Sequence, residues 1–504
     1  MPPKILFTLL AAPAAFLLAV SPLSPAEESL LSPISADSLK GHVSFLSSDL
    51  LEGRDTPSRG LDIAAEYIAA RFRALGLEPA GDDAYFQTAS FATVKQPMDS
   101  FELTIKLGDK DLNVAKDKAN VQTPRAAEFQ QVPLFKLDLE AVDALTAEHV
   151  GGKAVIWTMP GNLFSMSDAD RGNLMRKLTH AREVIAGLKP ALVLTTGFGG
   201  GMGGGVRLRE LSEETSSSLT NVFVRDLDAA KALSDLPSGP ANGSVTAKIS
   251  APEETPVKLK NVVGLLRGSD PVLKDTYILV TAHYDHIGVR PTGDGDRINN
   301  GANDDASGTS SVLELASAFA KSAQRPKRSI VFMTYFGEEK GLFGSRYYGK
   351  HPVFPLKQTV ANLNLEHMGR TDDTEGSTKG KLTASGFNYT TIGEVLTASG
   401  KLTGIETWFH EKNNDAFFGR SDNQSLADAG VPAITVAACW IFPDYHRPGD
   451  EWNKLDYANM EKLDKTIALA VWRIANDPAP PKWVDSNPKT EKYSKAYQTL
   501  HAGE

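Results

Sequence analysis

The chain has 504 residues, more than one ordinary hydrophobic core accommodates, which favours two or three domains. Hydrophobic residues make up 41% and charged residues 23%, proportions typical of a soluble globular protein, which argue against a largely disordered chain or a multi-span membrane protein. The formal net charge is -9 and no dense run of Lys or Arg occurs, so nucleic acid is not an expected partner.

The N-terminus has the order of a secretory signal. Lys4 precedes an apolar stretch from Ile5 to about Val20, and small residues and prolines follow. This stretch is shorter than the roughly 20 residues that span a bilayer, so we expect a signal peptide over residues 1–26, cleaved after Ala26, and no stable membrane insertion afterwards. The mature protein is then periplasmic or extracellular. The single cysteine, Cys439, excludes an internal disulfide, and its apolar surroundings predict a buried structural thiol.

Residues 62–75 predict an amphipathic helix, with Gly76 as its C-terminal cap. Its apolar face would contain Ile63, Tyr67, Ile68, Phe72 and Leu75. From residue 101 to 255 the pattern changes to short β-like runs, such as 153–159 and 190–196, with a helix around 168–187. This stretch predicts a separate, inserted β-rich module.

From residue 256 onward, β-branched runs alternate with helical patterns. Such runs, buried on both sides, predict an α/β fold with a mostly parallel central sheet and helices on both of its faces. We expect strands at 261–268, 276–283, 329–336, 359–367 and 432–439, and a helix at about 309–322. Because ligands of such sheets bind outside the carboxyl ends of the strands, residues just after each strand are the candidates for chemistry.

Histidines and carboxylates follow these predicted strands. The residues are His283, Glu338 and Glu339, Glu366, and His446, and the loop before the helix at 309 adds Asp304. Imidazole nitrogen and carboxylate oxygen are the ligands that zinc prefers. Two zinc ions carry four positive charges; the three carboxylates at 304, 339 and 366 leave one, which a bound hydroxide would neutralise. The set therefore predicts two zinc ions per chain, and Asp285 can orient His283 through its second ring nitrogen.

Five strings occur in the order AHYDHIG, GANDDASGT, FGEEKGLFGS, NLNLEHMG and YHRPGD. Together they resemble the co-catalytic di-zinc metallopeptidases that include the secreted bacterial leucyl aminopeptidases, with glutamate carboxypeptidase and the transferrin receptor as relatives. The resemblance covers about 258–475 closely. It implies a catalytic domain of residues 27–100 and 256–480, a protease-associated domain inserted at 101–255, and a C-terminal tail at 481–504.

The resemblance also implies a role for each site residue. Asp304 would bridge the metals, Glu339 and His446 would complete one site, and His283 and Glu366 the other. Glu338 matches the general base and Tyr445 a residue that binds the oxyanion. The expected activity is removal of N-terminal residues from peptides by a metal-bound hydroxide. Many relatives have Asp where Glu366 stands, so the longer side chain puts the spacing of that metal in doubt.

Several further motifs and activities fit these residues less well. The glycines at 199, 201 and 204 match a nucleotide-binding pattern, but no acidic partner is evident, which favours a flexible loop. We expect His286, His351 and His367 to lie around the site or on the surface. Carboxypeptidase activity would need Arg370, Arg420 or Arg447 to pair with a terminal carboxylate. Two more functions stay open, a single-zinc glutaminyl cyclase and a non-enzymatic binding module. The sequence leaves side-chain specificity and oligomeric state open as well.

Overall fold

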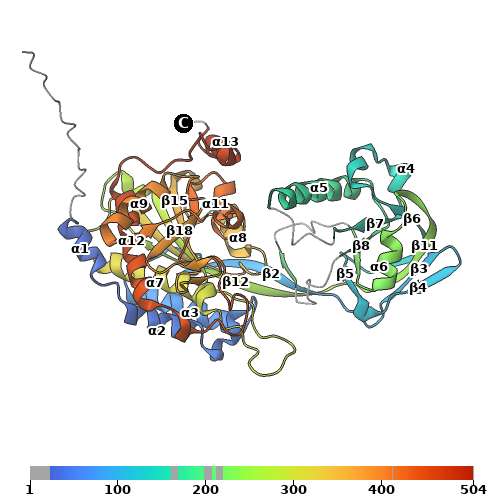
Figure 1. The fold of residues 1–504 in the computed structure, drawn as a ribbon, viewed down its shortest axis with the longest axis horizontal. Helices are drawn as coiled ribbons and strands as arrows, with labels where there is room; N and C mark the ends of the chain where they lie inside the picture. The colour runs from blue at the N-terminus through green and yellow to red at the C-terminus, as the bar shows by residue number, and fades with distance from the viewer. Residues whose placement is uncertain (1–22, 161–167, 198–206, 212–218, 411, 503–504) are drawn as a thin grey trace, which may run out of the picture. The chain divides into compact units, whose positions relative to one another are not determined.

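The computed structural model describes residues 23–160, 168–197, 207–211, 219–410 and 412–502, and it divides into two compact units (Figure 1). One unit contains residues 1–87 and 262–504, and the other contains residues 88–261. The strands β2 (Phe86–Lys95) and β12 (Glu253–Leu266) carry the chain from one unit to the other. Most of the expected signal peptide and the glycines at 199, 201 and 204 lie outside the described residues.

The first unit is built on a mostly parallel sheet. Its central strands are β20 (Ala433–Ala437), β15 (Thr359–Leu365), β13 (Tyr277–His283) and β14 (Ser329–Tyr335), which lie side by side in this order and run parallel. At the two sides, β18 (Lys381–Ser385) pairs antiparallel with β20, and β12 pairs antiparallel with β14. The short strand β19 (Glu406–Thr407) pairs parallel with β18, and β1 (Glu78–Pro79) pairs antiparallel with β12. All the central strands match those expected from the sequence.

Helices cover both faces of this sheet. Every residue of β13 and β14 is buried, because side chains that alternate along a strand meet helices on either side. Met333 shares a core with α8 (Phe343–Lys350), α11 (Asn423–Asp428) and α13 (Glu491–Leu500). Its neighbour Phe332 points the other way and meets Phe319 of α7 (Gly308–Lys321), which in turn contacts Trp472 of α12 (Tyr457–Asn476). The predicted fold class is confirmed.

The predicted helix at 62–75 is α3 (Arg59–Ala74). Gly76 follows its C-cap with a positive φ of 69°, as expected of a glycine that ends a helix. The buried face is centred on Ile68 and Phe72, whereas Ile63 and Tyr67 lie half-buried at its margin. Alanines at 64, 65 and 69 are buried in the same face, and their small side chains let this helix approach its neighbours closely. The remaining helices of this unit are α1 (Pro25–Leu31), α2 (Ala36–Leu46), α9 (Ile392–Thr403) and α10 (Asn414–Phe417).

The second unit is β-rich, as expected of the inserted segment. In its described residues an eight-stranded sheet has the order β4-β3-β11-β6-β7-β8-β10-β5. Its strands are β3 (Glu102–Leu107), β4 (Lys110–Asn113), β5 (Ala119–Gln122), β6 (Ala127–Lys136), β7 (Ala154–Thr158), β8 (Leu192–Thr196), β10 (Asn221–Val224) and β11 (Gly239–Ile249). The strand β9 (Arg207–Glu210) pairs with β2, and the helices are α4 (Ala147–Val150), α5 (Asp168–Gly187) and α6 (Leu227–Ser234). Two hydrophobic clusters give this unit a core of its own.

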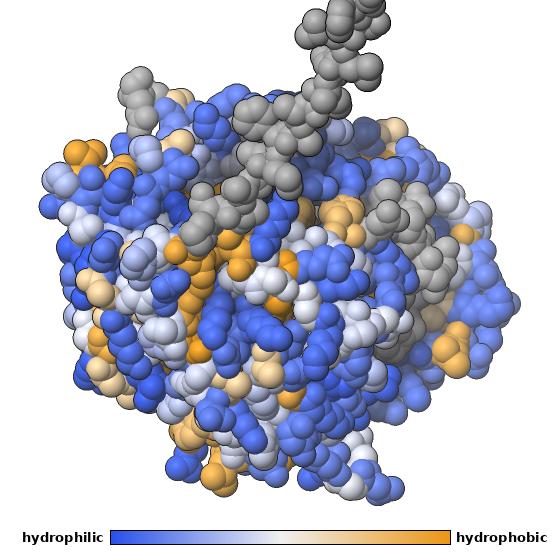
Figure 2. Space-filling model, turned by 60° about the vertical axis from the view of Figure 1, so that its left-hand side comes forward, coloured by the Kyte–Doolittle hydropathy of each residue, from blue (hydrophilic) through white to orange (hydrophobic). Residues whose placement is uncertain are grey.

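One face of the molecule is predominantly polar, and Figure 2 shows that hydrophobic residues occur on it in small groups. None of the helices in the described residues has the length and apolar character required to cross a membrane. Cys439 is fully buried, as predicted, and its pKa is raised by burial, which leaves the thiol protonated and unreactive.

Candidate active site

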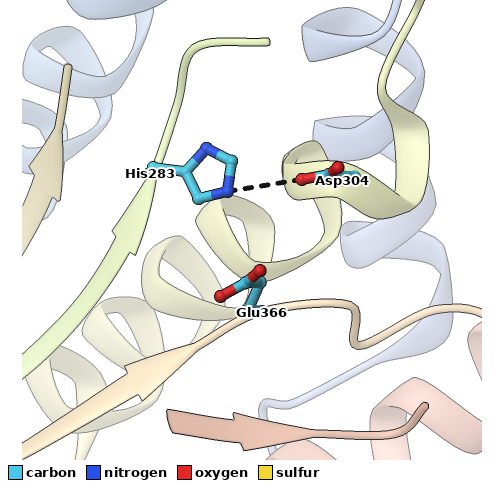
Figure 3. Close-up of side chains that lie close together, drawn as sticks. All are labelled: His283, Asp304 and Glu366. Atoms are coloured by element: carbon cyan, nitrogen blue, oxygen red, sulfur yellow. Dashed lines mark ion pairs between the residues drawn. The ribbon is translucent and has the colours of Figure 1, made fainter. Parts of the chain in front are cut away.

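Three of the predicted metal ligands lie together at the carboxyl ends of the central strands (Figure 3). His283 is the last residue of β13, Glu366 follows β15 directly, and Asp304 lies in the turn before α7. The Nε2 atom of His283 is 3.3 Å from the Oδ1 atom of Asp304. One ligand atom from each of the three side chains lies within 4.8 Å of the others, a spacing that a single metal ion can bridge.

The second oxygen of Asp304 faces the other two predicted ligands. His446 Nε2 lies 3.1 Å from Asp304 Oδ2 and 3.3 Å from Glu339 Oε2. His286, which was not expected among the ligands, is also here, with its Nδ1 atom 2.8 Å from Glu339 Oε1. The two oxygens of Asp304 therefore face different groups, which is the arrangement of a carboxylate between two metal ions.

The donor atoms at this centre fit a metal. Among the described residues, regular hydrogen bonds are absent for several buried atoms: His283 Nε2, Asp304 Oδ2, Glu339 Oε1, Glu366 Oε2 and His367 Nε2. Buried polar atoms normally have hydrogen-bond partners, so a convergent group without them requires another one. Burial acts to raise the pKa of Glu339, but contact with His286 and His446 lowers it to about 2. This carboxylate is thus ionised and able to bind a cation.

Local backbone geometry brings Asp304 to this position. Gly301, just before it, has a positive φ of 59°, and a Cβ atom there would lie 2.3 Å from the carbonyl oxygen of Asp304 and 2.5 Å from the His286 ring. Only glycine fits such a close approach. On the far side, the carboxylate of Asp450 accepts the backbone N–H groups of Asn303 and Asp304 at 2.9 to 3.0 Å. The turn is therefore fixed from both sides.

Asp285 contacts His283 differently from the expectation. The His283 Nδ1 atom is 3.2 Å from the backbone oxygen of Asp285 and 3.6 Å from its carboxylate. That carboxylate accepts the N–H of Glu338 at 3.1 Å and the hydroxyl of Thr56 at 3.2 Å. Asp285 is thus in contact both with His283 and with the peptide that carries Glu338.

Glu338, the expected general base, is part of the same electrostatic cluster. Burial raises the pKa of its carboxyl well above the usual range, His283 lowers it, and the nearby carboxylates of Glu366 and Glu339 raise it further. A carboxyl with a raised pKa is suited to accept and then return a proton near neutral pH. Tyr445 stacks on His446 with 4.0 Å between ring centroids and lies beside His367 at 5.3 Å.

Sequence reasoning missed Arg54. Its side chain is fully buried, and its guanidinium donates to the backbone oxygens of Leu46, Tyr284, Asn300 and Gly301. Three of these oxygens lie on the loops that follow His283 and precede Asp304. Arg54 stands in the stretch FLSSDLLEGRDTPSRG at residues 45–60, and nothing in that stretch indicates that the arginine will be buried.

The three arginines considered for a terminal carboxylate have separate environments. Arg370 is bound through two nitrogens to Asp372, at 2.8 and 2.6 Å, and through the third to Asp444 at 2.9 Å. Its charge is already satisfied. Arg420 is exposed, with its guanidinium 4.3 Å from the centre of the Phe417 ring, and Arg447 is exposed as well. His351 lies on the surface at the C-terminal end of α8.

The chain is similar in sequence and in fold to known metallopeptidases. Residues 261–471 match the family model of Peptidase family M28, and this stretch includes all five predicted ligands, Glu338 and Tyr445. The fold extends the similarity to most of the chain. An aminopeptidase from Aneurinibacillus sp. strain AM-1 superposes with a TM-score of 0.58 at 20% identity, covering 91% of this chain and 97% of that one.

Among curated proteins the similarity is to zinc proteases and aminopeptidases. A probable zinc metalloprotease of Pyrenophora teres f. teres is 29% identical over 46% of this chain and 52% of its own length. Aminopeptidase YwaD of Bacillus subtilis is 25% identical over 46% and 48%. A probable leucine aminopeptidase of Trichophyton verrucosum is 28% identical over 42% and 57%. The chain thus spans about half the length of the curated relatives it matches.

Proposed function

We propose that the chain is a zinc-dependent aminopeptidase of the M28 type that binds two zinc ions and removes N-terminal residues from peptides. The observation that carries the proposal is the convergence of His283, Asp304, Glu339, Glu366 and His446, with buried donor atoms that lack other partners. The M28 match over the same residues, and the zinc metalloprotease and aminopeptidases among the similar proteins, support it.

The chain's own residues have separate roles in the proposed reaction. Two zinc ions, when bound, acidify a water molecule and polarise the scissile carbonyl. Glu338 accepts a proton from the attacking water and passes it to the leaving amine. The Asp285 carboxylate holds the peptide of Glu338 in place, and the Tyr445 hydroxyl stabilises the oxyanion. We also propose that the inserted unit is a protease-associated domain and that the protein is exported.

Two observations favour an aminopeptidase over a carboxypeptidase or a cyclase. Arg370, the buried one of the three candidate arginines, is bound by Asp372 and Asp444, so it is not available for the terminal carboxylate that a carboxypeptidase must hold. Histidine nitrogens face both oxygens of Asp304, that of His283 at Oδ1 and that of His446 at Oδ2, which favours two metal ions over the single ion of a cyclase. A non-enzymatic binding module needs neither the candidate metal ligands nor the buried carboxyl of Glu338.

The decisive experiment combines metal analysis with a peptide panel. We expect two zinc ions per chain, reversible loss of activity with a chelator, and cleavage of peptides with free N-termini. Peptides with an acetylated N-terminus should resist, while those with an amidated C-terminus should be cleaved equally well. Cleavage that depends on a free C-terminus would point to a carboxypeptidase, and cyclisation of N-terminal glutamine by protein holding one metal would point to a cyclase.

A further inference from the structure

His367 is a fully buried histidine that the proposed metal set leaves out. It follows Glu366 directly, adopts a positive φ of 53°, and its ring lies beside the carboxylates of Asp304 and Glu366. Its ring packs edge-on against Phe442 and Tyr445, with centroids 5.4 and 5.3 Å away. Because it is fully buried and packed on these rings, the imidazole has a single orientation.

The hydrogen bonding of His367 determines which ring nitrogen carries the proton. Its Nδ1 atom lies 3.1 Å from the backbone oxygen of Trp440. A carbonyl oxygen only accepts hydrogen bonds, so Nδ1 is the donor, and in the neutral ring the lone pair is on Nε2. His283 has the same pattern, with Nδ1 against the Asp285 carbonyl. Histidines that bind metals usually donate their other N–H group in this way.

Distances from Nε2 of His367 fit a shared metal. This atom lies 3.6 Å from Asp304 Oδ1 and 3.7 Å from Glu366 Oε1. Zinc bonds of about 2.0 to 2.2 Å at tetrahedral angles place two ligand atoms roughly 3.3 to 3.6 Å apart. The distance from His283 to Asp304, at 3.3 Å, and that from His367 to Asp304, at 3.6 Å, fall within that range, and the 3.7 Å from His367 to Glu366 lies just above it. Nε2 of His367 makes no regular hydrogen bond in the described residues.

His286 serves as the contrast. Its Nδ1 atom is only 2.8 Å from Glu339 Oε1, which is shorter than the separation of two ligands on one zinc ion, although neither atom makes a regular hydrogen bond in the described residues. Its distance from Asp304 Oδ2 is 3.8 Å. With Asp304 and Glu339, His286 forms a second group of side chains whose ligand atoms lie within 4.8 Å of one another. These distances place His286 beside Glu339 and not at the ion that Glu366 would hold.

We propose that His367 binds, through Nε2, the metal ion held by Glu366 and Asp304. The inference rests on the proposed function, since it concerns the same metal pair. That ion would then have two imidazoles, from His283 and His367, the terminal carboxylate of Glu366 and the bridging carboxylate of Asp304. A second imidazole strengthens the preference for zinc or cobalt over manganese or magnesium, which favour oxygen ligands.

The test uses full-length protein loaded with two cobalt ions. In its proton NMR spectrum, each bound imidazole contributes a paramagnetically shifted N–H signal, and burial of the His367 Nδ1 proton against Trp440 slows its exchange. We expect His367→Ala to lose one such signal and to bind one of its two metals more than about 100-fold more weakly in competition with a chelator. A residue that only orients a ligand typically affects affinity about 10 to 100-fold.

Two further variants complete the experiment. His286→Ala is the matched control: it should weaken only the ion beside Glu339, while the ion beside Glu366 keeps its wild-type affinity and its N–H signals. His367→Asn retains a donor for the Trp440 carbonyl, so it keeps the inference testable if the alanine variant does not fold. Unchanged signals and wild-type affinity for both metals in a folded His367 variant would overturn the inference alone. Wild-type protein that binds no zinc would overturn the proposed function.

Discussion

At the scale of single residues, Glu338 and Glu339 are adjacent acids with opposite electrostatics. Burial raises the pKa of Glu338, whereas contacts with His286 and His446 lower the pKa of Glu339 to about 2. Environments that separate two acids in this way assign one to proton transfer and the other to charge pairing. The sequence shows only two neighbouring glutamates, so the distinction between them rests on resemblance alone until the structure supplies a physical cause.

Glu338→Gln should separate binding from chemistry. The amide cannot accept the proton, so turnover should fall by about 10² to 10⁴-fold, while zinc content stays at the wild-type value because the residue is no ligand. Asp304→Ala is the control and should lose metal as well as activity. Steady-state kinetics with metal analysis of both variants provides the measurement; near-normal turnover of Glu338→Gln would show that another group is the base.

Glu366→Ala should empty the two metal sites in a defined order. Removing this carboxylate leaves excess positive charge on the ion beside His283 and Asp304, so that ion should dissociate first on titration with a chelator. Glu366→Asp, with a shorter arm, should lower activity moderately and keep one metal tight. Earlier loss of the ion beside Glu339 and His446 would refute the proposed pairing of ligands.

At the scale of elements, the parallel strands were readable from the sequence because each is a continuous apolar run buried on both faces. The same logic located the candidate site, since residues after β13, β14, β15 and β20 share one edge of the sheet. The features that could not be predicted from the sequence depend on contacts between residues far apart in the chain. The Arg54 side chain reaches carbonyls near residues 284 and 300, and His286 and His367 are brought to the cluster by the turns that carry them.

Helix α12 contains a carboxyl that costs stability. Asp464 is fully buried against α7, and burial raises its pKa well above the usual range, partly offset by the Ser311 hydroxyl. The folded protein therefore favours the protonated form, and the free energy of unfolding falls as pH rises above the unfolded pKa of about 4. Asp464→Asn should raise the free energy of unfolding at pH 8 by about 1 kcal/mol or more and have little effect near pH 4.

Glu461 on the same helix is a matched control with the opposite sign. Lys465 lowers its pKa, so Glu461→Gln should lower stability at pH 8 and have less effect at acid pH, where both states are protonated. Urea unfolding of the two variants at both pH values provides the comparison. Equal effects of Asp464→Asn at pH 4 and pH 8 would show that the carboxyl is ionised in the folded protein.

At the scale of the whole molecule, two compact units with separate cores predict two unfolding transitions. All the candidate ligands lie in the unit of residues 1–87 and 262–504. Bound zinc stabilises only the unit that holds it, so a chelator should lower one transition temperature and leave the other unchanged. Differential scanning calorimetry with and without chelator measures both; a shift of both transitions together would show that the units unfold as one.

The site residues are spread along the chain, and this determines the stage of synthesis at which the site can form. Along the chain, the strands β14, β15, β18 and β20 lie between His283 and His446. Asp450, four residues beyond His446, fixes the backbone of Asp304. A nascent chain that ends before residue 450 therefore carries the base and most donors but cannot assemble the centre that uses them. Assembly of the proposed zinc centre is in this way deferred until residue 450 has been made and folded, so shorter nascent chains should lack the proposed peptidase activity.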